Sequence, residues 1–89
     1  MREAKLYSII EDFQSSTDFV GNEIQCRMLS EKPIPRSINN DEDVKILYLK
    51  GFFYEWDGCK TPEPEFKSMN NMWKAFMKGC LDASWKKIR

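Results

Sequence analysis

The chain of 89 residues has 42% hydrophobic and 31% charged side chains, a composition that predicts one soluble folded domain around one hydrophobic core. Its 14 basic and 14 acidic side chains cancel, which excludes the global positive field that draws proteins to nucleic acid. No apolar run approaches the roughly 20 residues of a membrane span and no signal-peptide cleavage site is apparent, so we expect a cytoplasmic protein with no membrane partner.

The first 30 residues carry helical periodicity. Four apolar residues recur at spacings of three and four and predict a helix over about residues 2–14: Leu6, Ile9, Ile10 and Phe13. The polar residues 15–18 are typical of a helix stop and restart. Beyond them, Val20, Ile24 and Met28 keep helical spacing, whereas Ile24, Cys26 and Met28 also alternate with polar residues as a strand would. We favour an N-terminal helical region over residues 2–30 and leave a strand open for residues 19–29.

A linker and an unusual helix follow. Pro33 and Pro35 force extended backbone within a linker over residues 31–40. Residues 39–43, Asn-Asn-Asp-Glu-Asp, supply a capping residue and first-turn carboxylates for a helix over about residues 41–57. On a helical wheel this segment has two apolar arcs, Ile46, Leu49, Phe53 and Trp56 in one and Val44, Leu47, Gly51 and Tyr54 in the other. A helix that is apolar on two sides either lies at the centre of a fold or binds a partner.

The last segment has the strongest periodicity in the chain. Thr61 and Pro62 suit the cap and first turn of a helix over about residues 63–86. Its apolar residues recur at threes and fours: Met69, Met72, Trp73, Phe76, Met77, Cys80 and Leu81. Ala75, Gly79 and Ala83 form a small-residue strip where another backbone can approach closely. We predict a single all-α domain of three or four helices over residues 1–89, with an antiparallel C-terminal helix pair over residues 41–86.

The residues that usually carry catalysis are sparse. The chain has no histidine, the commonest general base and metal ligand near neutral pH. Cys26, Cys59 and Cys80 fit neither a disulfide framework nor a zinc site, so we expect reduced, mostly buried thiols, with Cys59 as the candidate for exposure. The carboxylate clusters lie at predicted helix starts or on a solvent-exposed helix face. We therefore expect a protein that is not an enzyme and holds no cofactor or metal.

From Tyr48 to Ala83 the chain carries a pattern of aromatic residues, glycines, a cysteine and a proline. Its positions are Tyr48, Gly51, Trp56, Gly58, Cys59, Pro62, Trp73, Gly79 and Ala83. This pattern resembles that of ribosome modulation factor and related small bacterial and phage proteins, over roughly the last 40 residues and none of the first 40. The resemblance implies a compact helix-turn-helix hairpin and a ribosomal partner. The chain departs from the family in its proline, which lies three residues after the cysteine, in Cys59-Lys60-Thr61-Pro62, and is not followed by tyrosine. It also lacks the strongly basic character of the family, so the resemblance supports the shape more than the function.

The segment over residues 41–57 has more aromatic residues than one buried face holds, and exposed Tyr and Trp are common interface anchors. We predict a small regulator or inhibitor, of the kind that phages and mobile elements encode, which docks an aromatic and methionine surface onto a larger host protein. The candidate partner-binding residues are Phe52, Tyr54, Trp56, Trp73 and Trp85.

Two alternatives stay open. The first is a ribosome or RNA binder that uses the basic residues of the C-terminal helix, Lys74, Lys78, Lys86, Lys87 and Arg89, with Trp85 as a stacking surface. These residues also suit the solvated face of a helix and the negative end of its dipole. The second is a homodimer through the extra apolar arc. RNA binding would weaken as salt rises, whereas an aromatic interface would hardly change.

Overall fold

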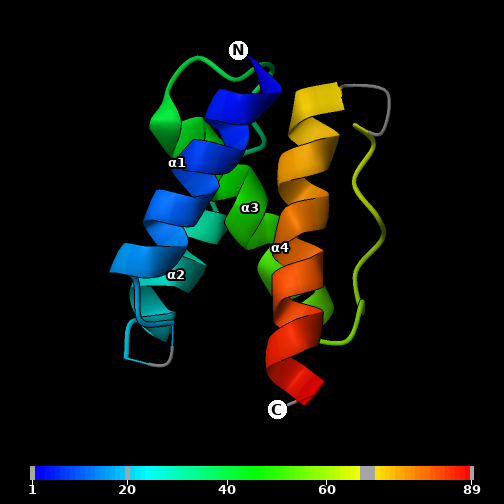
Figure 1. Ribbon diagram of the computed structural model, residues 1–89. Coiled ribbons are helices and arrows are strands. Elements are labelled where there is room, and N and C mark those ends of the chain that lie inside the picture. The colour runs from blue at the N-terminus through cyan, green and yellow to red at the C-terminus, as the bar shows by residue number, and fades with distance from the viewer. Residues whose placement is uncertain (1, 20, 67–69, 89) are drawn as a thin grey trace.

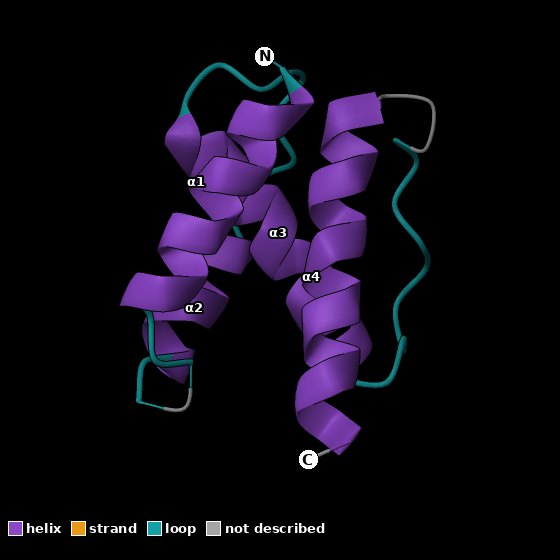
Figure 2. Cartoon of the chain, in the orientation of Figure 1, coloured by secondary structure: helices purple, strands orange, loops and turns teal. Residues whose placement is uncertain are grey.

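The computed structural model describes residues 2–19, 21–66 and 70–88. Within these ranges the chain forms four α-helices and no strand (Figures 1 and 2). The helices are α1 (Glu3–Ser16), α2 (Glu23–Ser30), α3 (Asp41–Trp56) and α4 (Asn70–Ile88). The prediction of a small all-α domain is confirmed. None of the described helices is both long enough and apolar enough to cross a bilayer.

The N-terminal helix α1 packs by the apolar face that its spacing predicts. Leu6, Ile9 and Ile10 are buried, and Phe13 is partly buried against the same core. The helix extends two residues further than the periodicity indicates, because the polar residues 15 and 16 continue its last turn. It contacts both α3 and α4 (Figure 1).

The second helix, α2, excludes the strand alternative over residues 23–30, but its orientation differs from the prediction. Ile24 and Met28 are 75% and 66% exposed, whereas Cys26 is buried. The charged Arg27 faces α3 instead. Its guanidinium donates two hydrogen bonds to the Asp57 carboxylate, at 3.0 and 2.9 Å, and lies 4.4 Å from the Phe53 ring centroid. This anchor sets the face of α2 that packs. Val20, which we expected beside Ile24, lies outside the described residues.

The central element is α3, which contacts each of the other three helices. Asn40 caps its start, because the Asn40 side-chain oxygen accepts a hydrogen bond from the Asp43 backbone N–H at 2.9 Å. At its end Gly58 has φ of +85° and the Cys59 N–H donates to the Tyr54 carbonyl at 2.8 Å, as in a Schellman motif. The two apolar arcs are therefore explained by the central position of α3. Both Phe52 and Phe53 are buried within the chain itself.

The helices α3 and α4 form the most extensive packing in the fold, and they cross where glycine allows it. A Cβ on Gly51 would collide with the backbone carbonyl of Phe76, and one on Gly79 would collide with the backbone of Tyr48 and Phe52. Ala75 and Ala83, on either side of Gly79 along α4, are fully buried. The close backbone approach predicted for this small-residue strip is confirmed.

The connection between α3 and α4 corrects the predicted start of the last helix. Residues 57–66 are irregular and α4 begins at Asn70, so Thr61 and Pro62 do not open a helix. Pro64 is the physical reason, because a proline disfavours helical backbone in the residue before it. The segment returns alongside α4, and Phe66 is buried against Trp73 and Phe76 (Figure 1). The C-terminal pair is thus a crossed pair joined by a long connection, without the short turn of a helix-turn-helix hairpin.

Candidate protein-binding groove

Three aromatic rings stack in a row on one side of α3. Phe19, in the turn between α1 and α2, stacks on Phe52 with ring centroids 4.7 Å apart and an interplanar angle of 12°. Phe52 in turn stacks on Trp56, one helical turn later, at 5.5 Å and 16°. Phe13 meets Phe19 edge to face at 5.9 Å and holds its ring in place. The row is a preformed apolar surface, because each ring is fixed by its neighbours.

Two adjacent hollows, of 250 and 120 Å³, lie over this row. They share Phe19 and Lys86. We call them together the aromatic groove. Its principal lining residues are Phe19, Tyr48, Phe52, Trp56, Trp85 and Lys86. The groove therefore lies between the turn after α1 and the C-terminal end of α4, with α3 as its floor.

Lys86 lies across the groove. Its Nζ is 5.5 Å from the centroid of the Phe19 ring, within the range of a cation–π contact. Because the Lys86 side chain is exposed and lines both hollows, it is positioned to move aside when a larger group enters. The polar residues Asp18 and Glu23 lie at the edge of the smaller hollow.

A partly buried polar cluster forms one wall of the groove and joins three helices. The Tyr48 hydroxyl donates a hydrogen bond to Asp82 Oδ2 at 2.5 Å, and the Gln14 side-chain amide donates to the same oxygen. Burial and the Asp82 carboxylate raise the pKa of Tyr48 well above its usual range. Gln14, Tyr48 and Asp82 come from α1, α3 and α4, so this cluster fixes the spacing of the helices that frame the groove.

An exposed apolar strip continues from the groove along α4. Trp85, which lines the groove, is 64% exposed, and Leu81 and Ile88 are 53% and 77% exposed. Their spacing of four and three residues places them on one face of the helix. Trp85 is the one residue of this strip that belongs to the predicted partner-binding set.

The structure brings together some of the predicted partner-binding residues and separates others. Trp56 and Trp85 line the aromatic groove, and Phe52 lies beneath it as a core residue. Tyr54 lines a different cavity. Trp73 stacks on Phe76 at 5.7 Å beside Phe66, away from the groove. Phe52, one of the partner-binding candidates, is buried, because Phe19 and Trp56 cover its ring.

The basic residues considered for RNA do not form a free positive patch. Lys74 pairs with Glu3 at 2.9 Å, and Lys78 lies 3.7 Å from Asp82. Lys86 covers Phe19, and the Lys87 ammonium donates to the Glu55 carbonyl. Arg89 lies outside the described residues. The four described lysines are thus directed at separate partners.

Sequence reasoning did not find several residues of the site. Phe19 is a single aromatic in a polar turn, and only its position after the predicted stop signal distinguishes it. Gln14 and Asp82 lie 68 residues apart and meet only in the folded chain. Leu81 fits the core-facing series of the last helix by spacing, yet it is 53% exposed, whereas Ala83, two residues later, is fully buried.

The three cysteines differ in exposure, and the pKa of each thiol is raised. Cys26 is buried, Cys80 half-buried and Cys59 exposed. Burial raises the pKa of Cys26 and raises that of Cys80 to about 12, and a hydrogen bond to Glu55 raises the pKa of Cys59. All three thiols are therefore kept protonated near neutral pH. Among the described residues, no three acidic or thiol side chains lie close enough to hold a metal ion.

Comparison of the chain with models of known protein families, with curated proteins and with solved structures finds no match. The resemblance to ribosome modulation factor remains a prediction from the pattern of its residues.

Proposed function

We propose that this protein is a small, non-enzymatic regulator or inhibitor that binds an apolar segment of a larger protein in the aromatic groove. The observation that carries the proposal is the position of Trp85. It joins a preformed stack of aromatic rings to an exposed strip made by Leu81 and Ile88. Tryptophan is among the residues most enriched at energetic hot spots of interfaces.

The geometry favours an apolar insertion over a flat contact. The floor of the groove is rigid, so a partner side chain that enters it meets an ordered surface at little cost in conformational entropy. The α4 strip then extends the contact beyond the groove, in the manner of an apolar face laid against a helix. Binding of this kind acts by occlusion or by locking a conformation of the partner, and it needs no bond to form or break.

A protein partner is favoured over RNA by the basic residues. Four lysines proposed for RNA contact a carboxylate, a carbonyl or a ring within the chain, and the formal net charge is zero. Phosphate binding would have to replace these contacts. The electrostatic term that supplies most non-specific RNA affinity is therefore weak.

Site-specific photo-cross-linking tests the proposal. We would place a benzophenone amino acid at Leu81 in the exposed strip, and at the exposed Asp12 of α1 as a control, and irradiate in lysate of the source organism. We expect a discrete protein adduct from position 81 only, which persists after nuclease treatment and falls at least 10-fold when Trp85→Ala is added. Adducts that are equal at both positions, or that vanish with nuclease, would contradict it. An adduct with a second copy of the chain would replace the host-protein partner with a homodimer.

A further inference from the structure

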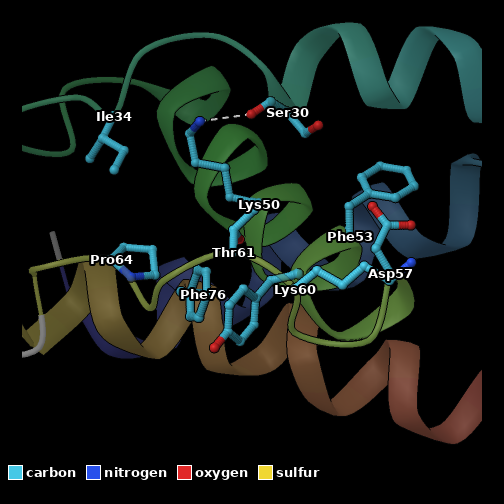
Figure 3. Close-up of a pocket in the computed structure, with 10 residues that line it drawn as sticks. Ser30, Ile34, Lys50, Phe53, Asp57, Lys60, Thr61, Pro64 and Phe76 are labelled. Carbon is cyan, nitrogen blue, oxygen red and sulfur yellow. Dashed lines mark hydrogen bonds between the residues drawn. The ribbon is translucent and has the colours of Figure 1, made fainter.

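A cavity of 620 Å³ lies apart from the groove and has a different lining (Figure 3). It is framed by the end of α2, the linker after it, the second half of α3 and the connection to α4. We call it the Lys50 cavity. Its volume is within the range of small-molecule sites, about 300 to 1,000 Å³. It shares only Phe53 with the aromatic groove.

Apolar side chains form part of the walls of the Lys50 cavity. Phe53 and Phe76 come from α3 and α4, and Ile34 and Pro64 come from the two irregular segments on either side (Figure 3). Ile34 is 44% exposed, although it projects over the cavity from a proline-bounded linker. Such walls suit an aromatic or aliphatic body, which gains free energy when it leaves water.

A half-buried ammonium group lies at one side of this apolar space. Lys50 Nζ donates one hydrogen bond, to the Ser30 carbonyl at 2.7 Å, and an ammonium has three donors (Figure 3). No carboxylate in the described ranges lies within 4.0 Å of it. Burial lowers the pKa of Lys50, and the charge of Glu31 opposes this shift. The bond to Ser30 also caps the end of α2, so Lys50 is held in place with donor capacity left over.

The other charged residues that line the cavity do not pair with Lys50. Asp57 lines the cavity, but its two carboxylate oxygens accept hydrogen bonds from Arg27. Lys60 also lines the cavity and adds a second positive charge. The pKa of Asp57 is lowered mainly by its hydrogen bond from Arg27, and Lys60 contributes further to this shift. Thr61 supplies a hydroxyl on the same side. Apolar walls with an unsatisfied cation are complementary to an anion that carries an apolar body.

We propose that the Lys50 cavity binds a small carboxylic acid with an aromatic or aliphatic body, its carboxylate on Lys50 and its body against Phe53 and Phe76. This inference is independent of the function proposed for the aromatic groove. The carboxylate belongs either to a free organic acid or to the C-terminus of a peptide with an apolar last residue, and these two sources share the chemistry that the cavity recognises.

Titration of the full chain, followed by ¹H–¹⁵N NMR, tests the site. The probe is 4-phenylbutanoate, and 4-phenylbutanamide is its uncharged control of the same shape. We expect saturable shifts that map to the cavity with the acid and at least 10-fold weaker binding of the amide. Equal binding of the two, or no saturable shift with any acid probe, would overturn the proposal. This comparison uses the unaltered protein, so it does not depend on how a variant folds.

Two variants and a second probe complete the test. Lys50→Met should weaken the acid at least 10-fold, whereas Lys45→Met should not, because Lys45 lies on the same helix with its Nζ over the Phe13 ring. Unchanged affinity of Lys50→Met would overturn the role of this residue.

An N-acetylated dipeptide with a C-terminal phenylalanine and a free carboxylate, compared with its C-terminal amide, distinguishes the two sources of the carboxylate. Tighter binding of the dipeptide acid than of phenylbutanoate assigns the site to peptide C-termini, and the reverse assigns it to free acids.

Discussion

At the scale of single residues, Tyr48 is the clearest case of a side chain with two roles. Its ring packs in the core against Phe13 and Phe19, while its hydroxyl joins Gln14 and Asp82 at the wall of the groove. A buried phenol that donates to a carboxylate favours its neutral form, because ionisation would place two negative charges together. The pKa of Tyr48 is accordingly raised by burial first and by Asp82 second.

This arrangement predicts a loss of stability in alkali. The folded pKa lies above the unfolded value of about 10, so the contribution is fully present below pH 10 and is lost as pH rises, at about 1.4 kcal/mol per pH unit. Urea unfolding from pH 8 to 11.5 should show this slope. Tyr48→Phe should be about 1 kcal/mol less stable at pH 8 but lose less stability above pH 10. Parallel pH profiles for the wild type and Tyr48→Phe would contradict the account.

Backbone conformation predicts opposite effects for two adjacent residues after α3. Gly58 has φ of +85° and a Cβ added there would meet no atom within 4 Å, so Gly58→Ala should lower the free energy of unfolding by about 1 kcal/mol through strain alone. Cys59 also has positive φ, of +56°, so Cys59→Gly should raise stability by about 0.5 kcal/mol or more. Thermal and urea unfolding measure both. A stabilised Gly58→Ala would contradict the left-handed backbone conformation of this turn.

At the scale of elements, the crossing of α3 and α4 depends on two glycines that face backbone. Gly79→Ala should cost about 3 kcal/mol or more, because a methyl group would push against the main chain of Tyr48 and Phe52, which cannot rotate away. Gly21→Ala is the control and should change stability by about 0.5 kcal/mol or less, since its new methyl would meet only the Asp18 side chain. Urea unfolding of both variants checks this. Equal stabilities would mean that the helices do not cross at Gly79.

The starts of the helices differ in how well they can be predicted from the sequence. The start of α3 was predictable, because a cap and three carboxylates act within one turn of it. The start of α4 was not, since Pro62 is compatible with a first turn and only Pro64 and the burial of Phe66 decide against it. The helix α2 has only about two turns, so tertiary contacts decide which of its faces packs against the core. The ion pair between Arg27 and Asp57 turns that face inward, and Ile24 and Met28 stay exposed despite their helical spacing.

At the scale of the whole molecule, the groove is assembled from segments that are distant in sequence. The turn after α1, the middle of α3 and the end of α4 each supply part of it, so no local motif marks the site. The presence of aromatic anchors was predictable from composition, and Trp56 and Trp85 do line the groove. The contacts of the lysines within the chain could not be predicted from the sequence, because partners such as Lys74 and Glu3 are 71 residues apart.

The most direct test of the central claim is the affinity of the captured partner for the wild type and for Trp85→Ala, by calorimetry at 50 and 500 mM NaCl. The groove account predicts that Trp85→Ala loses about 2 kcal/mol or more, roughly 30-fold. It predicts that salt changes the wild-type affinity by less than about 3-fold, and that Glu11→Ala, on the exposed face of α1, binds normally. Unchanged binding of Trp85→Ala, or a steep fall in affinity with salt, would contradict it.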